Sequence, residues 1–211
     1  MTVTTSAQDF FNVIKERHSV RKYQPGITIP EEDLRDILES ATLAPSSWNL
    51  QHWKFLVIQE QENKEKLLPI AFNQQQVVDS SAMIAILGDQ EANLNAEEIY
   101  SDAVAKGFMS EDVKEGMLAQ INGAYASNPQ FGRDEAIRNG SLVAMQLMLA
   151  AKAKGYDTVA MGGFDPGKFV EEYKVPERYI PVMLIAVGKS AAPTHGTGRF
   201  PVEQMVIKES F

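Results

Sequence analysis

Apolar side chains recur every three or four residues in two stretches near the amino terminus, which is the pattern of a helix with one buried face. Residues 9–18 predict a short helix that turns Phe10, Phe11, Val13 and Ile14 toward the core. The acidic run at residues 31–33 favours a second helix start, because carboxylates stabilise the positive end of the helix dipole. This helix should extend to about residue 44, where Pro45 stops it. Its predicted buried face is Leu34, Ile37, Leu38 and Ala41.

Three short runs are continuously apolar rather than periodic, at residues 55–58, 83–87 and 181–187. Runs of this length and composition are typical of strands that are covered on both faces. A helix is predicted between the first two runs, at residues 63–72. The alternation of strands and helices indicates a central sheet flanked by helices, rather than a sandwich or a bundle.

The longest predicted helix covers residues 134–154, about 31 Å at the helical rise per residue. Its middle is apolar nearly all round, which predicts a central buried helix that ends at Gly155. Residues 95–132, in contrast, are polar and helical in tendency and predict an excursion from the core. Because the chain contains neither an internal repeat nor a linker, we expect one domain over residues 1–211.

Composition excludes several classes of function. The 211 residues include 20 basic and 28 acidic side chains, and a net charge of −8 makes nucleic acid an improbable partner. The chain has no cysteine, which excludes disulfides and thiolate chemistry, and its three histidines form no HExxH motif, so no metal site is expected. The amino terminus lacks the features of a signal peptide, and the longest apolar run is half a membrane span. We therefore expect a soluble, cytoplasmic protein.

Residues 17–23 (RHSVRKY) concentrate basic side chains in an acidic chain. Arg17, Ser19 and Arg21 share one side of an extended segment, and on a helix the two arginines also share a face. Converging guanidinium groups suit a phosphate or an electron-rich heterocycle, because they donate paired hydrogen bonds and keep their charge. Charge spacing alone, however, favours a solvated basic helix end.

Three further segments are rich in small and polar residues: 45–51 (PSSWNLQ), 161–165 (MGGFD) and 196–201 (GTGRFP). Each reads either as an ordinary turn or as backbone that approaches a ligand closely. Signatures of the common nucleotide and hydrolase sites are absent, since the chain contains no GxxxxGK[ST], GxGxxG or GxSxG motif.

Taken in order, RHSVRKY, APSSWNLQHWKFLVI, FNQQQV, GYDT with MGGFD, and GRFP resemble the nitroreductase family of FMN-dependent oxidoreductases, in particular its bacterial NAD(P)H nitroreductase branch. The resemblance extends from about residue 10 to about residue 206. It implies an α+β fold with a mixed central sheet flanked by helices. It also implies an intertwined homodimer with two FMN sites at the subunit interface, and a helical excursion at 95–132 near the active site.

The resemblance assigns roles to individual residues. Arg17 and Ser19, with His18 beside them, and Arg199 correspond to ligands of the FMN phosphate. Arg21 corresponds to a cation near the pyrimidine edge of the flavin. The remaining expected flavin contacts are Asn73, Gln76, Gly162 and Gly163 from the same subunit, and Pro45, Ser46, Ser47 and Asn49 from the partner.

Three positions depart from the better-known members of the family. Gln76 stands where a lysine is frequent, Thr197 replaces a second basic residue, and Gly162 replaces a carboxylate. The expected activity is transfer of hydride from NADH or NADPH through flavin N5 to nitroaromatic or quinone-type acceptors, by a ping-pong mechanism without a catalytic side chain. Three alternatives stay open: another flavin reaction such as dehydrogenation or dehalogenation, a flavin-binding stress protein, and an interaction module that uses residues 95–132.

Overall fold

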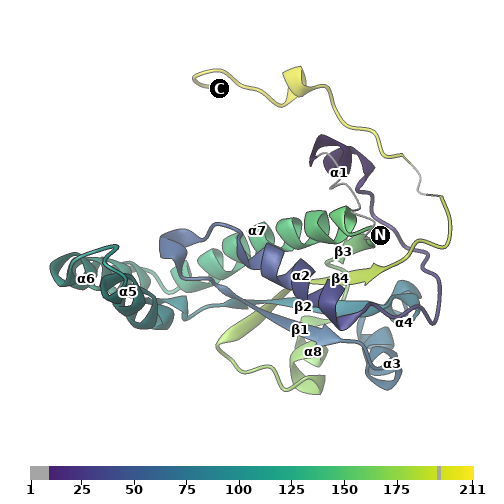
Figure 1. Cartoon of the computed structure of the whole chain (residues 1–211), viewed down its shortest axis with the longest axis horizontal. Coiled ribbons are helices and arrows are strands. Elements are labelled where there is room, and N and C mark those ends of the chain that lie inside the picture. The colour runs from purple at the N-terminus through teal and green to yellow at the C-terminus, as the bar shows by residue number, and fades with distance from the viewer. Residues whose placement is uncertain (1–9, 194–195) are drawn as a thin grey trace, which may run out of the picture.

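A computed structural model of the chain describes residues 10–193 and 196–211 (Figure 1). The expected helix start at Asp9 and the features of the first nine residues lie outside this range. Four strands form one sheet: β1 (Trp53–Ile58), β2 (Ala82–Asp89), β3 (Asp157–Met161) and β4 (Tyr179–Gly188). Their order is β1-β2-β4-β3, and every neighbouring pair is antiparallel. A parallel bridge joins Ser19 to Thr158 at the β3 edge. The predicted α+β class, with a helix-flanked sheet, is confirmed.

Burial along the strands follows from their places in the sheet. Every residue of the inner strand β2 is buried, as its unbroken apolar run predicts. Strand β1, at the edge, buries only its terminal residues Trp53 and Ile58, so the prediction that 55–58 is covered on both faces was wrong. Strand β3 was not predicted, because its first residues, Asp157 and Thr158, do not continue an apolar run.

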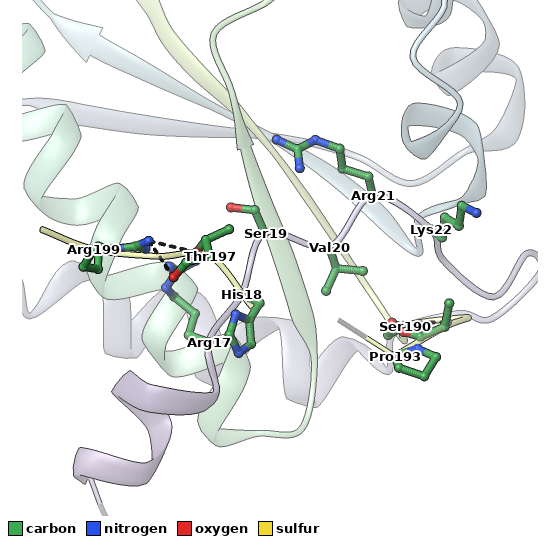
Figure 2. Close-up of a pocket in the computed structure, with 11 residues that line it drawn as sticks. Arg17, His18, Ser19, Val20, Arg21, Lys22, Ser190, Pro193, Thr197 and Arg199 are labelled. Carbon is green, nitrogen blue, oxygen red and sulfur yellow. Dashed lines mark hydrogen bonds between the residues drawn. The ribbon is translucent and has the colours of Figure 1, made fainter. Parts of the chain in front are cut away.

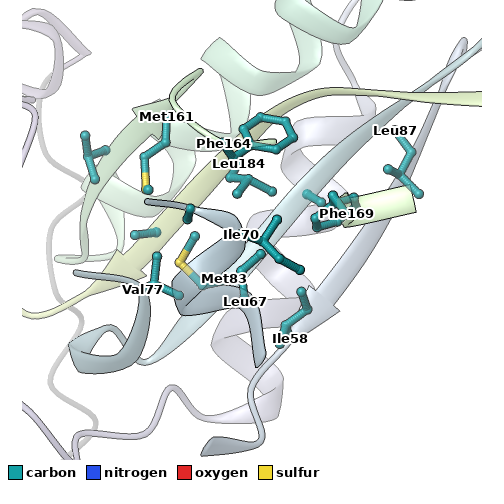
Figure 3. Close-up of a cluster of buried hydrophobic side chains, with 14 of the residues drawn as sticks. Ile58, Leu67, Ile70, Val77, Met83, Leu87, Met161, Phe164, Phe169 and Leu184 are labelled. Carbon is teal, nitrogen blue, oxygen red and sulfur yellow. The ribbon is translucent and has the colours of Figure 1, made fainter. Parts of the chain in front are cut away.

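Two helical layers cover the sheet (Figure 1). Helices α2 (Glu31–Thr42) and α7 (Phe131–Ala153) cover one face, where Ile84 and Ile185 belong to the buried cluster. Helices α3 (Gln61–Ile70), α4 (Gln76–Asp79) and α8 (Pro166–Glu172) cover the other face, where Met83 and Leu184 pack against Phe169 (Figure 3). Successive residues of a strand point to opposite faces, so the continuous apolar runs of β2 and β4 supply both clusters.

The predicted faces of three helices are only partly correct. In α2, Leu34, Ile37 and Ala41 are buried, whereas Leu38 is half-buried, and the helix ends at Thr42 before Pro45 is reached. In α1 (Phe10–Glu16) only Val13 is buried, so the expected burial of Phe10, Phe11 and Ile14 is wrong for a single chain. In α7, Leu142 and Met145 are exposed, because the sheet covers only one side of the helix.

The 95–132 excursion projects beyond the end of the sheet as a helical pair, α5 (Ala96–Ala105) and α6 (Glu111–Ser127), after the short helix η2 (Ala92–Asn95) (Figure 1). The pair has a small core of its own around Leu50, Tyr100 and Ile121. Arg178 fixes the base of the excursion, since its guanidinium pairs with Asp89 at 2.6 Å and donates to Asn95 Oδ1 at 2.9 Å.

The carboxyl-terminal tail leaves the sheet after β4 and runs past α1 to an end far from the core (Figure 1). It contains one short helix, η3 (Val202–Gln204). Its large apolar side chains are exposed: Phe200, Val202, Met205, Val206, Ile207 and Phe211. Among the described residues, no helix is both long enough and apolar enough to cross a membrane.

Candidate functional site: a cationic pocket between the two arms of the chain

Two segments that are far apart in the sequence, residues 17–22 and 190–199, line one pocket of about 470 Å³ (Figure 2). Its lining residues are Arg17, His18, Ser19, Val20, Arg21, Lys22, Ser190, Ala192, Pro193, Thr197 and Arg199. Four of these carry a permanent positive charge near neutral pH, and none of them is acidic. In a chain with a net charge of −8, this pocket is therefore a local site of positive potential.

The segment 17–23 is extended, which decides between the two geometries that the sequence allowed. Helix α1 ends at Glu16, and Ser19 then forms its bridge to Thr158 while the Val20 amide donates to Thr158 O at 3.0 Å. Val20 and Tyr23 are buried in the same cluster as Met83, Leu184 and Phe169. Burial raises the pKa of the Tyr23 phenol. Because Ser19 and Arg21 alternate with Val20 along this extended backbone, they point to the opposite, pocket side.

The arginine of the late glycine turn faces the same space. Arg199 Nη1 donates to the carbonyl of Thr197, to its hydroxyl at 2.8 Å, and to Gly198 O at 2.8 Å. Figure 2 shows the Arg17 side chain reaching toward Thr197 and Arg199. Within the described ranges, neither Arg17 nor Arg21 forms an ion pair. Their charges thus remain available to an anion.

A second group of polar residues lies where β3 ends and α4 begins. Gln76, only 6% exposed, donates from Nε2 to Gln74 Oε1 at 3.0 Å and lies 3.8 Å from the Met161 sulfur. Gln74 Nε2 donates in turn to Gly163 O at 2.7 Å. The two bonds link Gln76 to Gly163 through Gln74. The sequence reasoning missed Gln74, and only its place in the QQQ run pointed to it.

The neighbouring predicted residues are exposed at the same end of the sheet. Asn73 is exposed and has a left-handed backbone, with φ of 57°, which its amide stabilises by donating to Leu68 O at 2.9 Å. Gly162 and Gly163 are exposed directly after β3. Strand β3 connects this group to the cationic pocket, because Thr158 pairs with Ser19 and Gly162 follows four residues later, about 13 Å along a strand.

The loop at residues 45–51 lies elsewhere in the chain. Ser46 Oγ accepts a hydrogen bond from the Gln51 amide at 3.0 Å, and Pro45 and Asn49 are exposed. Trp48, Asn49 and Gln51 all have positive φ, a strained conformation that costs roughly 1–3 kcal/mol per residue and needs support from its surroundings.

Contacts with α7 place this loop far from the cationic pocket. The Ser47 amide donates to Asn139 Oδ1 at 2.9 Å, in the amino-terminal half of α7. The pocket lies beyond the opposite end of that helix, where Thr158 follows α7 and pairs with Ser19. Residues 139–153 alone span about 21 Å of helix. One chain therefore does not bring Pro45, Ser46, Ser47 and Asn49 to the residues that line the pocket. The sequence reasoning also missed Glu135 and Asn139, which hold this loop and belong to no recognisable motif.

Comparison with known proteins identifies the family. A model of the nitroreductase family matches residues 14–189 of this chain. The chain is also 50% identical over 194 residues to "Putative NAD(P)H nitroreductase YodC" of Bacillus subtilis, and the match covers 92% of this chain and 96% of that protein. The chain belongs to the nitroreductase family. It is therefore an enzyme of an oxidoreductase family, as the resemblance predicted.

Other similar proteins add structural context. The fold superposes with a TM-score of 0.90 on a structure named "putative nitroreductase in complex with FMN" from Exiguobacterium sibiricum, at 41% identity over 96% of this chain and 98% of that one. A "putative NAD(P)H:FMN oxidoreductase" from Staphylococcus epidermidis gives a TM-score of 0.91 at 40% identity, over 98% and 99% of the two chains. A "CLA biosynthesis enone reductase" of Lactiplantibacillus plantarum is 36% identical over 90% of this chain and 89% of its own length.

Proposed function

We propose that this nitroreductase-family protein binds FMN and catalyses hydride transfer from NADH or NADPH to a small organic acceptor. The observation that carries the proposal is the pocket in which Arg17, Arg21, Lys22 and Arg199 meet no carboxylate. A phosphate monoester fits this donor set, because guanidinium groups bind phosphate oxygens with paired, charge-assisted hydrogen bonds. The relative from Exiguobacterium sibiricum, named as a complex with FMN, supports the same cofactor.

The proposed roles of the lining residues follow from their positions. Arg17, Ser19 and Arg199 hold the phosphate, with His18 beside them. Residues 73–76 and the Gly162–Gly163 turn would receive the ring at the far end of β3, where Asn73, Gln76 and the two glycines supply polar groups. The roughly 13 Å along β3 from Thr158, the partner of Ser19, to Gly162 suits an extended mononucleotide with its phosphate at one end and its ring at the other.

Bound FMN would supply the redox chemistry, which is hydride transfer from NAD(P)H to the acceptor. Arg21 contributes a fixed positive charge on the pocket side, which stabilises negative charge that develops at the pyrimidine edge of the ring. No side chain needs to act as a nucleophile. Donor and acceptor occupy one site in turn, so we propose ping-pong kinetics with nitroaromatic or quinone-type acceptors.

We further propose that the active form is an intertwined homodimer with both FMN sites at the interface. The loop at residues 45–49 lies too far from the pocket of its own chain to contact the same flavin. Apolar side chains of α1, α7 and the tail are exposed, among them Phe11, Leu142, Phe200 and Phe211. Exposed apolar surface of this extent is typical of a protein interface, so a second copy of the chain would both cover it and supply the loop.

Anaerobic reduction tests the redox part of the proposal. The purified protein, loaded with FMN, should lose its yellow absorbance on addition of NADH or NADPH and regain it with a quinone or nitroaromatic compound. Initial rates measured against NADH or NADPH at several fixed acceptor concentrations should give parallel double-reciprocal lines. A protein that binds FMN but reacts with each acceptor no faster than free reduced FMN would instead be a flavin-binding protein, and the catalytic proposal would fail.

The dimer requires a separate measurement. Sedimentation equilibrium of the FMN-loaded protein should give twice the chain mass of 23.4 kDa. A monomer that binds FMN at full affinity would contradict the proposed interface site.

A further inference from the structure

A buried carboxylate on α7 forms a hydrogen-bonded contact with the loop at residues 45–51. Glu135 is 3% exposed, although it belongs to a charged residue type that is rarely buried. Its Oε2 accepts a hydrogen bond from Ser47 Oγ and one from Asn139 Nδ2 at 3.0 Å, while Arg138 pairs with Oε1. The carboxylate is therefore fully engaged, and its principal long-range partner is the hydroxyl of Ser47.

Asn139 completes the attachment one helical turn later. Its side chain is 1% exposed, and its Nδ2 also donates to the Glu135 carbonyl at 2.8 Å. Its Oδ1 accepts the Ser47 amide at 2.9 Å. Glu135 thus holds the side chain of Ser47, and Asn139 holds its backbone, across a separation of about 90 residues in the sequence.

Packing alone does not require a charged side chain at the position of Glu135. A buried carboxylate carries a desolvation cost, and apolar residues of similar volume frequently stabilise a fold at least as well. Arg138 offsets this cost only in part, because 62% of its side chain is exposed. The Ser47 attachment immediately precedes the left-handed residues Trp48 and Asn49, whose conformation depends on external support.

We propose that Glu135 and Asn139 are positioning residues of the FMN site. They hold Ser47 so that the loop at residues 45–49 keeps the shape in which it contacts the flavin ring of the partner subunit. This inference rests on the proposed function, in which FMN binds at a subunit interface. It adds that Glu135 and Asn139, which do not line the cationic pocket, affect the affinity of the partner subunit for FMN.

A double-mutant cycle on the full-length dimer tests the inference. The variants are Glu135→Gln, Ser47→Ala and the two combined. Asp33→Asn is the matched control, since it converts another hydrogen-bonded carboxylate, the acceptor of Tyr156 Oη at 2.7 Å, to an amide in the first turn of α2, outside the 45–51 loop. The measured quantities are the FMN dissociation constant, the visible circular dichroism of bound FMN, and the unfolding midpoint.

Each single variant should weaken FMN binding by about tenfold and alter the visible dichroism, because Glu135→Gln removes the charge of the acceptor and Ser47→Ala removes the donor of one charge-assisted hydrogen bond. The combined variant should bind FMN no more weakly than the worse single variant, since both changes remove one contact. Ser47→Thr, which retains the hydroxyl, should restore affinity, and Asp33→Asn should leave FMN affinity and dichroism unchanged. If Glu135→Gln is insoluble, Asn139→Ala carries the comparison, since it removes the acceptor of the Ser47 amide at 2.9 Å.

The outcomes distinguish this inference from the proposed function. If the wild-type protein binds no FMN, both fail together. If the wild-type protein binds FMN, but Glu135→Gln lowers only the unfolding midpoint and leaves affinity and dichroism at wild-type values, the positioning role is overturned and the proposed function stands. Additive losses in the combined variant would likewise show that Glu135 does not act through Ser47.

Discussion

Replacement of Arg17 by alanine tests whether the cationic pocket binds the FMN phosphate, with little effect on the fold. The guanidinium is partly exposed and has no hydrogen bond or ion pair among the residues that the structure describes, so its loss leaves no buried protein group unsatisfied. Unfolding free energy should change by less than about 0.5 kcal/mol, as at other sites without internal contacts. A hydrogen bond to a charged group is worth about 1.5–3 kcal/mol, so the FMN dissociation constant should rise by about 10- to 150-fold.

Fluorescence titration of the apoprotein measures this change with FMN and with riboflavin, which lacks the phosphate. Arg17→Ala should weaken FMN by the stated factor and riboflavin by less than about twofold. Lys15→Ala is the matched control, because it removes the same charge from the exposed side of α1 outside the pocket. Equal losses for FMN and riboflavin, or an equal loss of FMN affinity in Lys15→Ala, would refute the reasoning.

Three further variants test charge elsewhere in the chain. Arg21→Ala should lower flavin affinity and the midpoint potential of bound FMN, and an unchanged potential would exclude its electrostatic role. Arg178→Met should lower the unfolding free energy by about 3–5 kcal/mol in urea, because it leaves the buried carboxylate of Asp89 unpaired; a loss below about 1 kcal/mol would contradict this. His52 is fully buried, and burial lowers its pKa to about 4. The unfolded chain therefore binds the proton first, and stability should fall by up to about 3 kcal/mol between pH 6.5 and pH 4. A His52→Asn variant that kept the same pH slope would exclude His52 as its source.

Hydrophobic periodicity predicted the elements that one chain buries by itself. Strands β2 and β4 alternate Met83 with Ile84, and Leu184 with Ile185, between two clusters, so their apolar runs were sufficient. The same reasoning failed for α1, where three of the four apolar residues are exposed in the single chain. A pattern of this kind reports that a surface will be covered, and it does not specify whether the same chain covers it.

The site was harder to predict from the sequence than the fold. Charge spacing at residues 17–21 favoured a solvated helix end, and only the family resemblance connected it with Arg199. The physical connection is the antiparallel Tyr23–Ser190 bridge, which joins residues 17–23 to the start of the tail that carries Arg199. Gln74 and Glu135 escaped notice because they are common polar residues whose roles arise from contacts across about 90 residues of sequence.

A crystal structure of the protein with FMN tests the central claim most directly, through the distances from the phosphate oxygens to the guanidinium nitrogens. The account predicts hydrogen-bond distances to both Arg17 and Arg199 of the same chain. A phosphate bound away from both arginines would contradict it.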